Sequence, residues 1–141
     1  MKLLSWNCVL LEYRDRAVST RPEGVGNAAL PPQSGHFENV LVVFTCVEVQ
    51  DDANTVVRAA EAISDLATQM GRSEIALVPF GHLSSALQTD SAVAVGLINS
   101  LASSLRVDSL AVTLTSFGYH KDFELHFKAL GHAGAVAFRD L

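Results

Sequence analysis

Residues 40–49 limit what this chain can fold into more than any other segment, because they form a nearly continuous run of β-branched and aromatic apolar residues. Such a run is typical of a strand that is covered on both faces and lies inside a sheet. Residues 54–70 follow with apolar side chains at helical spacing, and Gly71 predicts the end of this helix. Residues 73–79 form a second apolar strand. Strand, helix and strand in this order predict a right-handed parallel crossover.

The second half of the chain predicts one more helix and two more strands. Residues 91–106 carry an apolar stripe, and Asp90 is a suitable N-cap for this helix. Residues 110–115 and 122–128 alternate between apolar and polar side chains, as strands with one buried face do. Because the link 118–121 is short, we expect these two strands to pair as an antiparallel hairpin. The predicted sheet is therefore mixed, with two main helices.

The two ends of the chain and one internal stretch give weaker signals. The apolar opening is interrupted by Asn7, Glu12 and Arg14 and has no cleavage site, so it predicts a first strand and not a secretory signal. Residues 20–35 are rich in proline and glycine, which predicts a long surface loop, either a lid or a variable excursion. Residues 131–141 have no clear period, and no element is predicted there.

Composition indicates one globular domain over residues 1–141. A chain of 141 residues, of which 49% are hydrophobic, can bury one substantial core. Its apolar runs are shorter than the roughly 20 residues that a bilayer requires, so we expect a soluble protein without a membrane partner. The net charge of -5 argues against a protein that coats nucleic acid through charge alone. Any RNA contact has to be local or has to depend on another domain.

Two segments lie where a ligand is expected. In a parallel α/β unit, ligands collect at the carboxyl ends of strands. Residues 79–85 (Pro-Phe-Gly-His-Leu-Ser-Ser) occupy that place after the second parallel strand, and residues 117–121 (Phe-Gly-Tyr-His-Lys) link the last two strands. His82 is either a ligand-facing group or a capping histidine at the edge of the core. Lysine is positively charged at neutral pH, so Lys121 suits a phosphate or a ribose, or else is a solvated turn lysine.

Neither metal nor cofactor chemistry is indicated. The five histidines are scattered without a helical pair, and Cys8 and Cys46 have no near partner. Two cysteines in a domain of this size are typical of reduced, buried thiols in the cytoplasm. Ser84 and Ser85 lie outside a Gly-x-Ser-x-Gly elbow, and residues 24–26 lack the third glycine of a dinucleotide fingerprint. We therefore expect no metal, no cofactor and no serine nucleophile.

Four segments in this order resemble one known family, the N-terminal editing domain of archaeal threonyl-tRNA synthetases. They are the strand 40–48, the segments 79–85 and 117–121, and Gly131-His132 near the end. Together with the opening strand, the resemblance runs the whole length of the chain. The family shares its fold with D-aminoacyl-tRNA deacylases, so the resemblance implies a deacylase-like α/β fold with a mixed β-sheet and two main helices.

The resemblance implies a proofreading reaction, the hydrolysis of the ester that joins L-serine to the terminal adenosine of tRNA(Thr). A synthetic site for threonine cannot strongly reject serine, because one missing methyl is worth only about 1–3 kcal/mol. A second pocket just large enough for serine excludes threonine by a clash with its extra methyl. In this family the 2'-hydroxyl of the terminal adenosine is understood to help activate water, while the protein mainly positions the substrate.

The resemblance also implies roles for individual residues. The catalytic pair is Lys121 and His82, with His82 close to the ester or the ribose. The residues that bind the substrate are Val47, Pro79, Phe80, Gly81, Phe117 and Tyr119. Among these, the backbone of Val47 and Gly81 borders the seryl group, Phe117 forms a wall, and Tyr119 joins Lys121 on the terminal nucleotide. The chain departs from the family pattern at Val136, where relatives carry an acid, at Cys8-Val9 and at His120.

Partners follow from the same resemblance. They are the 3' end of tRNA(Thr) carrying serine, the catalytic and anticodon-binding domains of threonyl-tRNA synthetase in cis or in trans, and a second copy in a homodimer. Two other functions stay open. One is a D-aminoacyl-tRNA deacylase of broad specificity, and the other is a non-catalytic regulatory module that binds an amino acid or a nucleotide.

Overall fold

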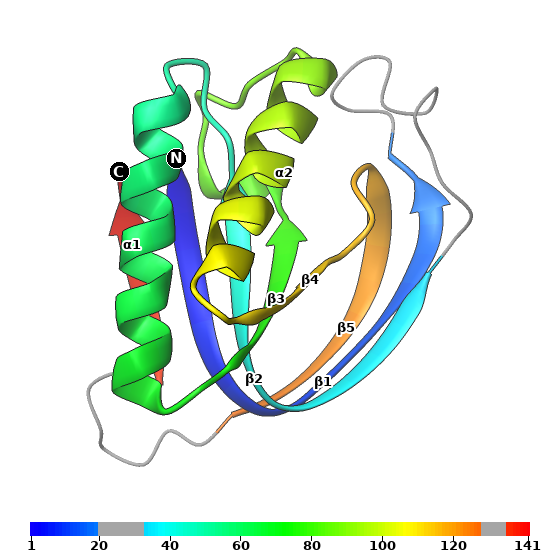
Figure 1. The fold of residues 1–141 in the computed structure, drawn as a ribbon. Coiled ribbons are helices and arrows are strands. Elements are labelled where there is room, and N and C mark those ends of the chain that lie inside the picture. Colours follow the sequence, from blue (N-terminus) through cyan, green and yellow to red (C-terminus); the bar gives the residue numbers. More distant parts are fainter. Residues whose placement is uncertain (20–32, 128–134) are drawn as a thin grey trace.

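The fold is one mixed sheet with two α-helices side by side on one of its faces (Figure 1). This computed structural model describes residues 1–19, 33–127 and 135–141. Neither α-helix combines the length and the apolar character that a bilayer crossing demands. In chain order the described elements are β1 (Lys2–Val18), β2 (Ser34–Cys46), α1 (Ala53–Met70), β3 (Glu74–Pro79), the 3-10 turn η2 (Gly81–Leu83), α2 (Ser91–Val107), β4 (Ala111–Leu114), β5 (Tyr119–Phe127) and β6 (Val136–Asp140).

The strand order β4-β3-β2-β1-β5 places β2 in the middle of the sheet, and β6 also pairs with β1. The three strands β2, β3 and β4 run parallel, whereas β1 is antiparallel to β2, β5 and β6. This confirms the mixed sheet and the central position of the apolar run 40–49. The strand itself begins earlier than predicted, at Ser34, and ends at Cys46.

Both helices begin and end close to where the sequence predicts. The Asp52 carboxylate caps α1 by accepting the Thr55 N–H at 2.9 Å. Gly71 ends α1 with φ 61°, in the left-handed region that glycine adopts most easily. Asp90 caps α2 by accepting the Ala92 N–H at 2.9 Å. The helices pack on the sheet through an apolar cluster, the helix-side core, whose largest buried side chains are Met1, Leu3, Leu41, Ile63, Ile75, Leu77, Leu101 and Leu105.

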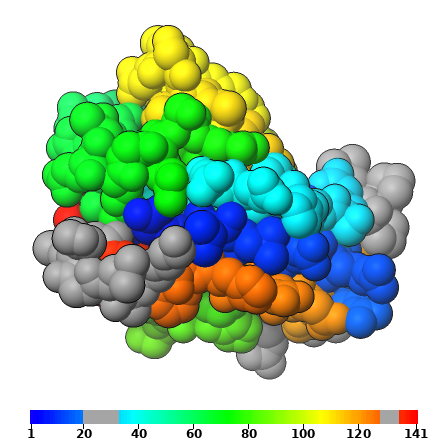
Figure 2. All heavy atoms as spheres, turned by 90° about the horizontal axis from the view of Figure 1, so that it is seen from below, coloured from blue at the N-terminus to red at the C-terminus, as the bar shows by residue number. Residues whose placement is uncertain are grey.

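A second apolar cluster covers the opposite face of the sheet, here called the free face. Along β2, Leu41 and Val43 contribute to the helix-side core, while Val42 and Phe44 contribute to this free-face core. The strand therefore has to be apolar on both sides. Seen from below, β2, β1 and β5 form adjacent bands (Figure 2). The buried members of the free-face core are Cys8, Leu11, Val40, Val42, Phe44, Ala76 and Val78, and Phe80, Leu83, Phe123 and Leu125 pack against them.

The predicted hairpin is wrong, because β4 and β5 lie at opposite edges of the sheet. The strand β5 pairs instead with residues 8–18 of β1, and it already begins with residues 119–121, which were predicted as a link. The alternation of β5 is confirmed, since Phe123 and Leu125 face the free-face core while His126 is exposed. Alternation shows which side of a strand is buried, but it does not show which strand is the neighbour.

Two further boundaries differ from the prediction. Ser34 and Gly35 belong to β2 and not to the predicted loop, of which residues 20–32 lie outside the described part. A Cβ at Gly35 would lie 2.5 Å from Tyr13 Cε1. A glycine is therefore needed here because the aromatic ring packs closely on the strand, and not because the chain turns. Residues 136–140, where no element was predicted, form β6 along the first part of β1.

Candidate active site

The segment that carries His82 is held against the carboxyl end of β2. The Phe80 N–H donates to Thr45 O at 2.8 Å, just before the turn η2. After the turn, the Gln88 N–H donates to Val47 O at 2.9 Å. The backbone is therefore fixed on both sides of His82, at the edge of the sheet where parallel strands end.

Gly81 allows a close contact inside this segment. A Cβ at position 81 would lie 3.3 Å from Leu87 Cδ2, so the Leu87 side chain occupies the space beside the Gly81 backbone. The Gly81 carbonyl accepts from Cys46 Sγ at 3.8 Å. His82 is exposed, and its ring meets the ring of Phe80 with centroids 5.2 Å apart. The glycine therefore brings the turn close to its neighbours, while the imidazole of His82 stays accessible.

A line of aromatic rings connects the His82 turn with β5. The Phe80 ring lies 5.0 Å from Phe44, and the Phe44 ring lies 5.3 Å from Phe123, both in edge-to-face geometry. Phe123 is two residues after Lys121 on β5, so the two side chains leave the strand on the same side. The turn and the first part of β5 consequently lie on the free face.

Lys121 takes part in a buried ion pair. Its Nζ lies 2.8 Å from Asp15 Oδ1, and the two side chains are 3% and 0% exposed. The same Nζ donates to Ser116 O at 2.6 Å and to Ser116 Oγ at 3.0 Å. The ammonium group thus makes two hydrogen bonds and one ion pair within the protein. Nζ also lies 5.6 Å from the centre of the Tyr119 ring. Lys121 is thus a fixed internal charge and not a solvated turn lysine.

Asp15 is kept ionised by its surroundings. Burial by itself acts to raise the pKa of this carboxyl, but hydrogen bonds from Lys121, Ser116 and the Gln33 N–H hold the pKa below its usual value. Neither Asp15 nor Ser116 was predicted as a site residue. The signal present in the sequence is the alternation that places Asp15 on the same buried side of β1 as Tyr13.

The structure separates some of the predicted substrate contacts from the others. The side chain of Val47 is buried in the helix-side core, and Phe117 packs against the same cluster. Phe80 packs on the free face together with the His82 ring. Pro79 is the last residue of β3 and pairs with Thr45. The free face therefore brings together the His82 turn and the start of β5, while Val47 can reach this region only through its backbone.

Two serine hydroxyls and the two cysteine thiols of the described residues differ from the nucleophile of a Ser-His or Cys-His pair. The Ser84 hydroxyl donates to Glu48, and the Ser116 hydroxyl donates to Asp15, so neither contacts a histidine. Burial raises the pKa of the Cys8 thiol to about 11 and also raises the pKa of the Cys46 thiol. Both thiols are therefore protonated at neutral pH. In the same part of the chain, no three His, Cys, Asp or Glu side chains are grouped in a way that suits a metal ion.

A polar groove of about 580 Å³ lies among β1, β2 and β5, and none of the predicted site residues lines it. Charged groups of both signs face it. Arg16 is paired with Asp122, and His36 lies 2.7 Å from Glu12. Much of the charge around this groove is therefore already compensated within the protein.

Comparison with known proteins finds relatives along the whole chain. The model of the archaea-specific editing domain of threonyl-tRNA synthetase matches residues 1–141. The threonine–tRNA ligase of Thermococcus kodakarensis is 34% identical over 146 residues, which cover 100% of this chain and 22% of the ligase. The ligase of Cenarchaeum symbiosum is 29% identical over 139 residues, which cover 99% of this chain and 21% of the ligase. The chain thus spans about a fifth of the length of these relatives.

A solved structure shares the fold. The c-Myc DNA Unwinding Element Binding Protein superposes with a TM-score of 0.68 over 100% of this chain and 99% of its own, at 13% sequence identity. At this identity the likeness concerns the fold alone. The D-aminoacyl-tRNA deacylase-like α/β fold expected from the sequence is confirmed.

Proposed function

Because this chain belongs to the archaea-specific family of threonyl-tRNA synthetase editing domains, we propose that it hydrolyses the ester between L-serine and the terminal adenosine of tRNA(Thr). The family match over residues 1–141 is the observation that carries this proposal. Such a domain removes serine after the synthetic site has attached it. That second step is needed because one missing methyl changes binding by only about 1–3 kcal/mol.

We place the reaction on the free face, between the His82 turn and the first residues of β5. The exposed His82 ring lies beside the ester or the ribose, and the backbone of Val47 and Gly81 borders the seryl group. Lys121 lies below the site as one end of a buried ion pair with Asp15. The ammonium end of this pair acts on a phosphate or a developing oxyanion through the fixed dipole of the pair. Tyr119, next to Lys121, contacts the terminal nucleotide.

In the proposed reaction the RNA supplies the group that activates water. The 2'-hydroxyl of the terminal adenosine orients a water molecule, whose oxygen attacks the ester carbonyl carbon. The bond from that carbon to the 3'-oxygen breaks, the 3'-oxygen takes up the proton that the attacking water loses, and free serine leaves. Two observations support this reaction. The Ser84 hydroxyl is bonded to Glu48 and to the Ala86 N–H rather than to a histidine, and the raised pKa of the buried Cys46 thiol disfavours a thiolate nucleophile.

The test uses the purified chain with L-seryl-tRNA(Thr), with D-seryl-tRNA(Thr) and with free serine. We expect release of L-serine at least about ten times faster than release of D-serine, and slower release when the tRNA ends in 2'-deoxyadenosine. Faster release of D-serine would indicate a D-aminoacyl-tRNA deacylase instead. Tight binding of free serine without turnover of either ester would indicate a regulatory module.

We also propose that other synthetase domains, in cis or in trans, deliver the tRNA, and that the domain works as a homodimer. The relatives are threonine–tRNA ligases about five times longer than this chain, which supports the presence of such domains. A net charge of -5 gives the domain little general attraction for RNA, so another domain has to contribute most of the binding.

A further inference from the structure

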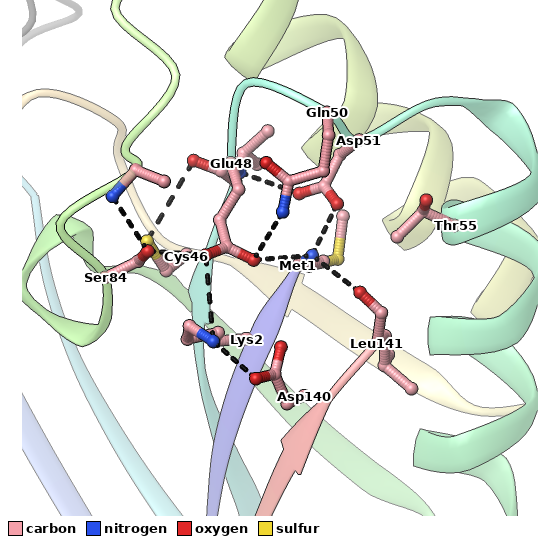
Figure 3. Close-up of polar contacts among 12 residues, drawn as sticks. Met1, Lys2, Cys46, Glu48, Gln50, Asp51, Thr55, Ser84, Asp140 and Leu141 are labelled. Carbon is pink, nitrogen blue, oxygen red and sulfur yellow. Dashed lines mark hydrogen bonds and ion pairs between the residues drawn. The ribbon is translucent and has the colours of Figure 1, made fainter.

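We propose that Glu48 and Ser84 form a positioning pair that holds the His82 turn in its working conformation, an inference that rests on the function proposed above. Glu48 follows β2 at its carboxyl end, and Ser84 is the first residue after η2. The Ser84 hydroxyl donates to Glu48 Oε1, as the close-up shows (Figure 3). Neither residue touches the substrate in this proposal, and both act through the turn.

The turn needs such an anchor because packing fixes only one end of it, where Leu83 lies against the free-face core. The 3-10 turn η2 has three residues, and none of them is buried. A segment with few buried contacts opens easily, unless polar bonds hold it. The position of the His82 ring therefore depends on the bonds that tie the turn to β2.

Glu48 is a suitable fixed point. It is 3% exposed, and its Oε2 accepts from the Met1 α-amino group at 3.1 Å. Lys2 Nζ lies 3.7 Å from Oε1, and the Glu48 N–H donates to Asp51 Oδ2 at 2.7 Å (Figure 3). A buried carboxylate with several such partners stays in one position, because each move would leave a charge unpaired.

The same partners keep the Glu48 carboxyl group ionised. Burial alone acts to raise the pKa of this carboxyl, but the bonds from Ser84 and the Met1 α-amino group, together with the charge of Lys2, hold it below the usual value. The bond from the Ser84 hydroxyl is consequently charge-assisted, and such bonds are about twice as strong as neutral ones.

The Ser84 hydroxyl connects this fixed point to the turn on both sides. Besides donating to Glu48, it accepts the Ala86 N–H at 3.0 Å. Ala86 O in turn accepts the Val49 N–H at 3.0 Å, which closes the connection to the chain after β2. Loss of the hydroxyl removes both bonds at once, and the Ala86 N–H loses its partner. The segment from η2 to Ala86 is then held mainly by its backbone bonds at the two ends.

The experiment compares Ser84→Ala with Ser84→Thr, which keeps the hydroxyl, and with Ser85→Ala at the exposed neighbouring serine. Hydrogen exchange of backbone amides and kcat/KM for L-seryl-tRNA(Thr) are measured on each. In Ser84→Ala we expect the amides of residues 81–88 to exchange at least about tenfold faster and kcat/KM to fall about tenfold. Amides of α1 should keep their rates, and Ser84→Thr should stay within about twofold of the parent.

Two results would overturn the positioning role. One is unchanged exchange of residues 81–88 in Ser84→Ala, and the other is an equal acceleration in Ser85→Ala. Fast exchange in Ser84→Ala with unchanged kcat/KM would overturn the link between the turn and the reaction. If the parent chain releases no serine at all, the proposed function fails, while the exchange rates still decide whether Ser84 holds the turn.

Discussion

Replacing Lys121 with methionine is expected to slow seryl-tRNA(Thr) hydrolysis about 100-fold and to lower the free energy of unfolding by about 3–5 kcal/mol. Lys121 Nζ lies 2.8 Å from Asp15 Oδ1 in a pair of almost fully buried side chains. Methionine fills similar space without charge, so the Asp15 carboxylate keeps only neutral donors such as Ser116. Serine release under single-turnover conditions and unfolding by urea measure the two effects.

The matched control is His126→Ala, further along β5, because the His126 side chain is 56% exposed and points away from the free-face core. We expect little change in either measurement. The double variant Asp15→Asn with Lys121→Met removes both charges, and it should regain most of the stability without regaining the rate. Recovery of the rate as well would show that Lys121 only stabilises the fold. Equal loss of rate from Lys121→Met and His126→Ala would show that the site lies elsewhere.

Replacing Phe44 with alanine is expected to lower the free energy of unfolding by about 3–5 kcal/mol. Phe44 is 6% exposed and lies 5.0 Å from the Phe80 ring and 5.3 Å from the Phe123 ring. The truncation leaves a cavity in the free-face core and removes the ring that connects the His82 turn with β5. We therefore also expect slower serine release, measured beside the unfolding curve.

The control for Phe44 is Phe138→Ala on β6, because the Phe138 side chain is 51% exposed. We expect this change to stay within about 0.5–1 kcal/mol. Phe44→Leu, which keeps an apolar side chain, should cost less than about 1.5 kcal/mol if the core adjusts around it. A loss from Phe138→Ala as large as that from Phe44→Ala would contradict a free-face core centred on Phe44.

The helices and the central strand could be predicted because their signals are local. Asp52, Gly71 and Asp90 act on backbone groups within a few residues of themselves, so the ends of both helices follow from the sequence. The run 40–49 is apolar at nearly every position, and only a strand covered on both faces needs that pattern. The predicted helix ends and the predicted central strand are correct because each depends on neighbouring residues in the sequence and not on a distant partner.

Strand pairing could not be predicted in the same way. The residues of β5 show their buried side through alternation, but they pair with residues 8–18 of β1, more than a hundred positions earlier in every pair. Gly35 was assigned to the predicted loop because glycine is common in turns. In the structure it lies in β2, where the Tyr13 ring leaves no room for a side chain. In both cases the deciding contact lies on another strand.

One segment of the proposed site could be predicted from a general rule, whereas the residues that hold this segment in place could not. The His82 turn follows a parallel strand, where ligands collect, and the structure places it at that edge. The partners that fix the site were missed because they are distant in sequence. Ser116 bonds to Asp15 across 101 positions, and Ser84 bonds to Glu48 across 36. A single sequence does not reveal such pairs, because each residue alone is an ordinary polar side chain.

The most direct test of the proposed proofreading is the ratio of two rates, measured with the same preparation of the chain. One is serine release from seryl-tRNA(Thr), and the other is threonine release from threonyl-tRNA(Thr). We predict that serine is released at least about 100-fold faster, because a pocket that fits serine meets the extra methyl of threonine as a clash. Equal rates on the two esters would contradict the proposal.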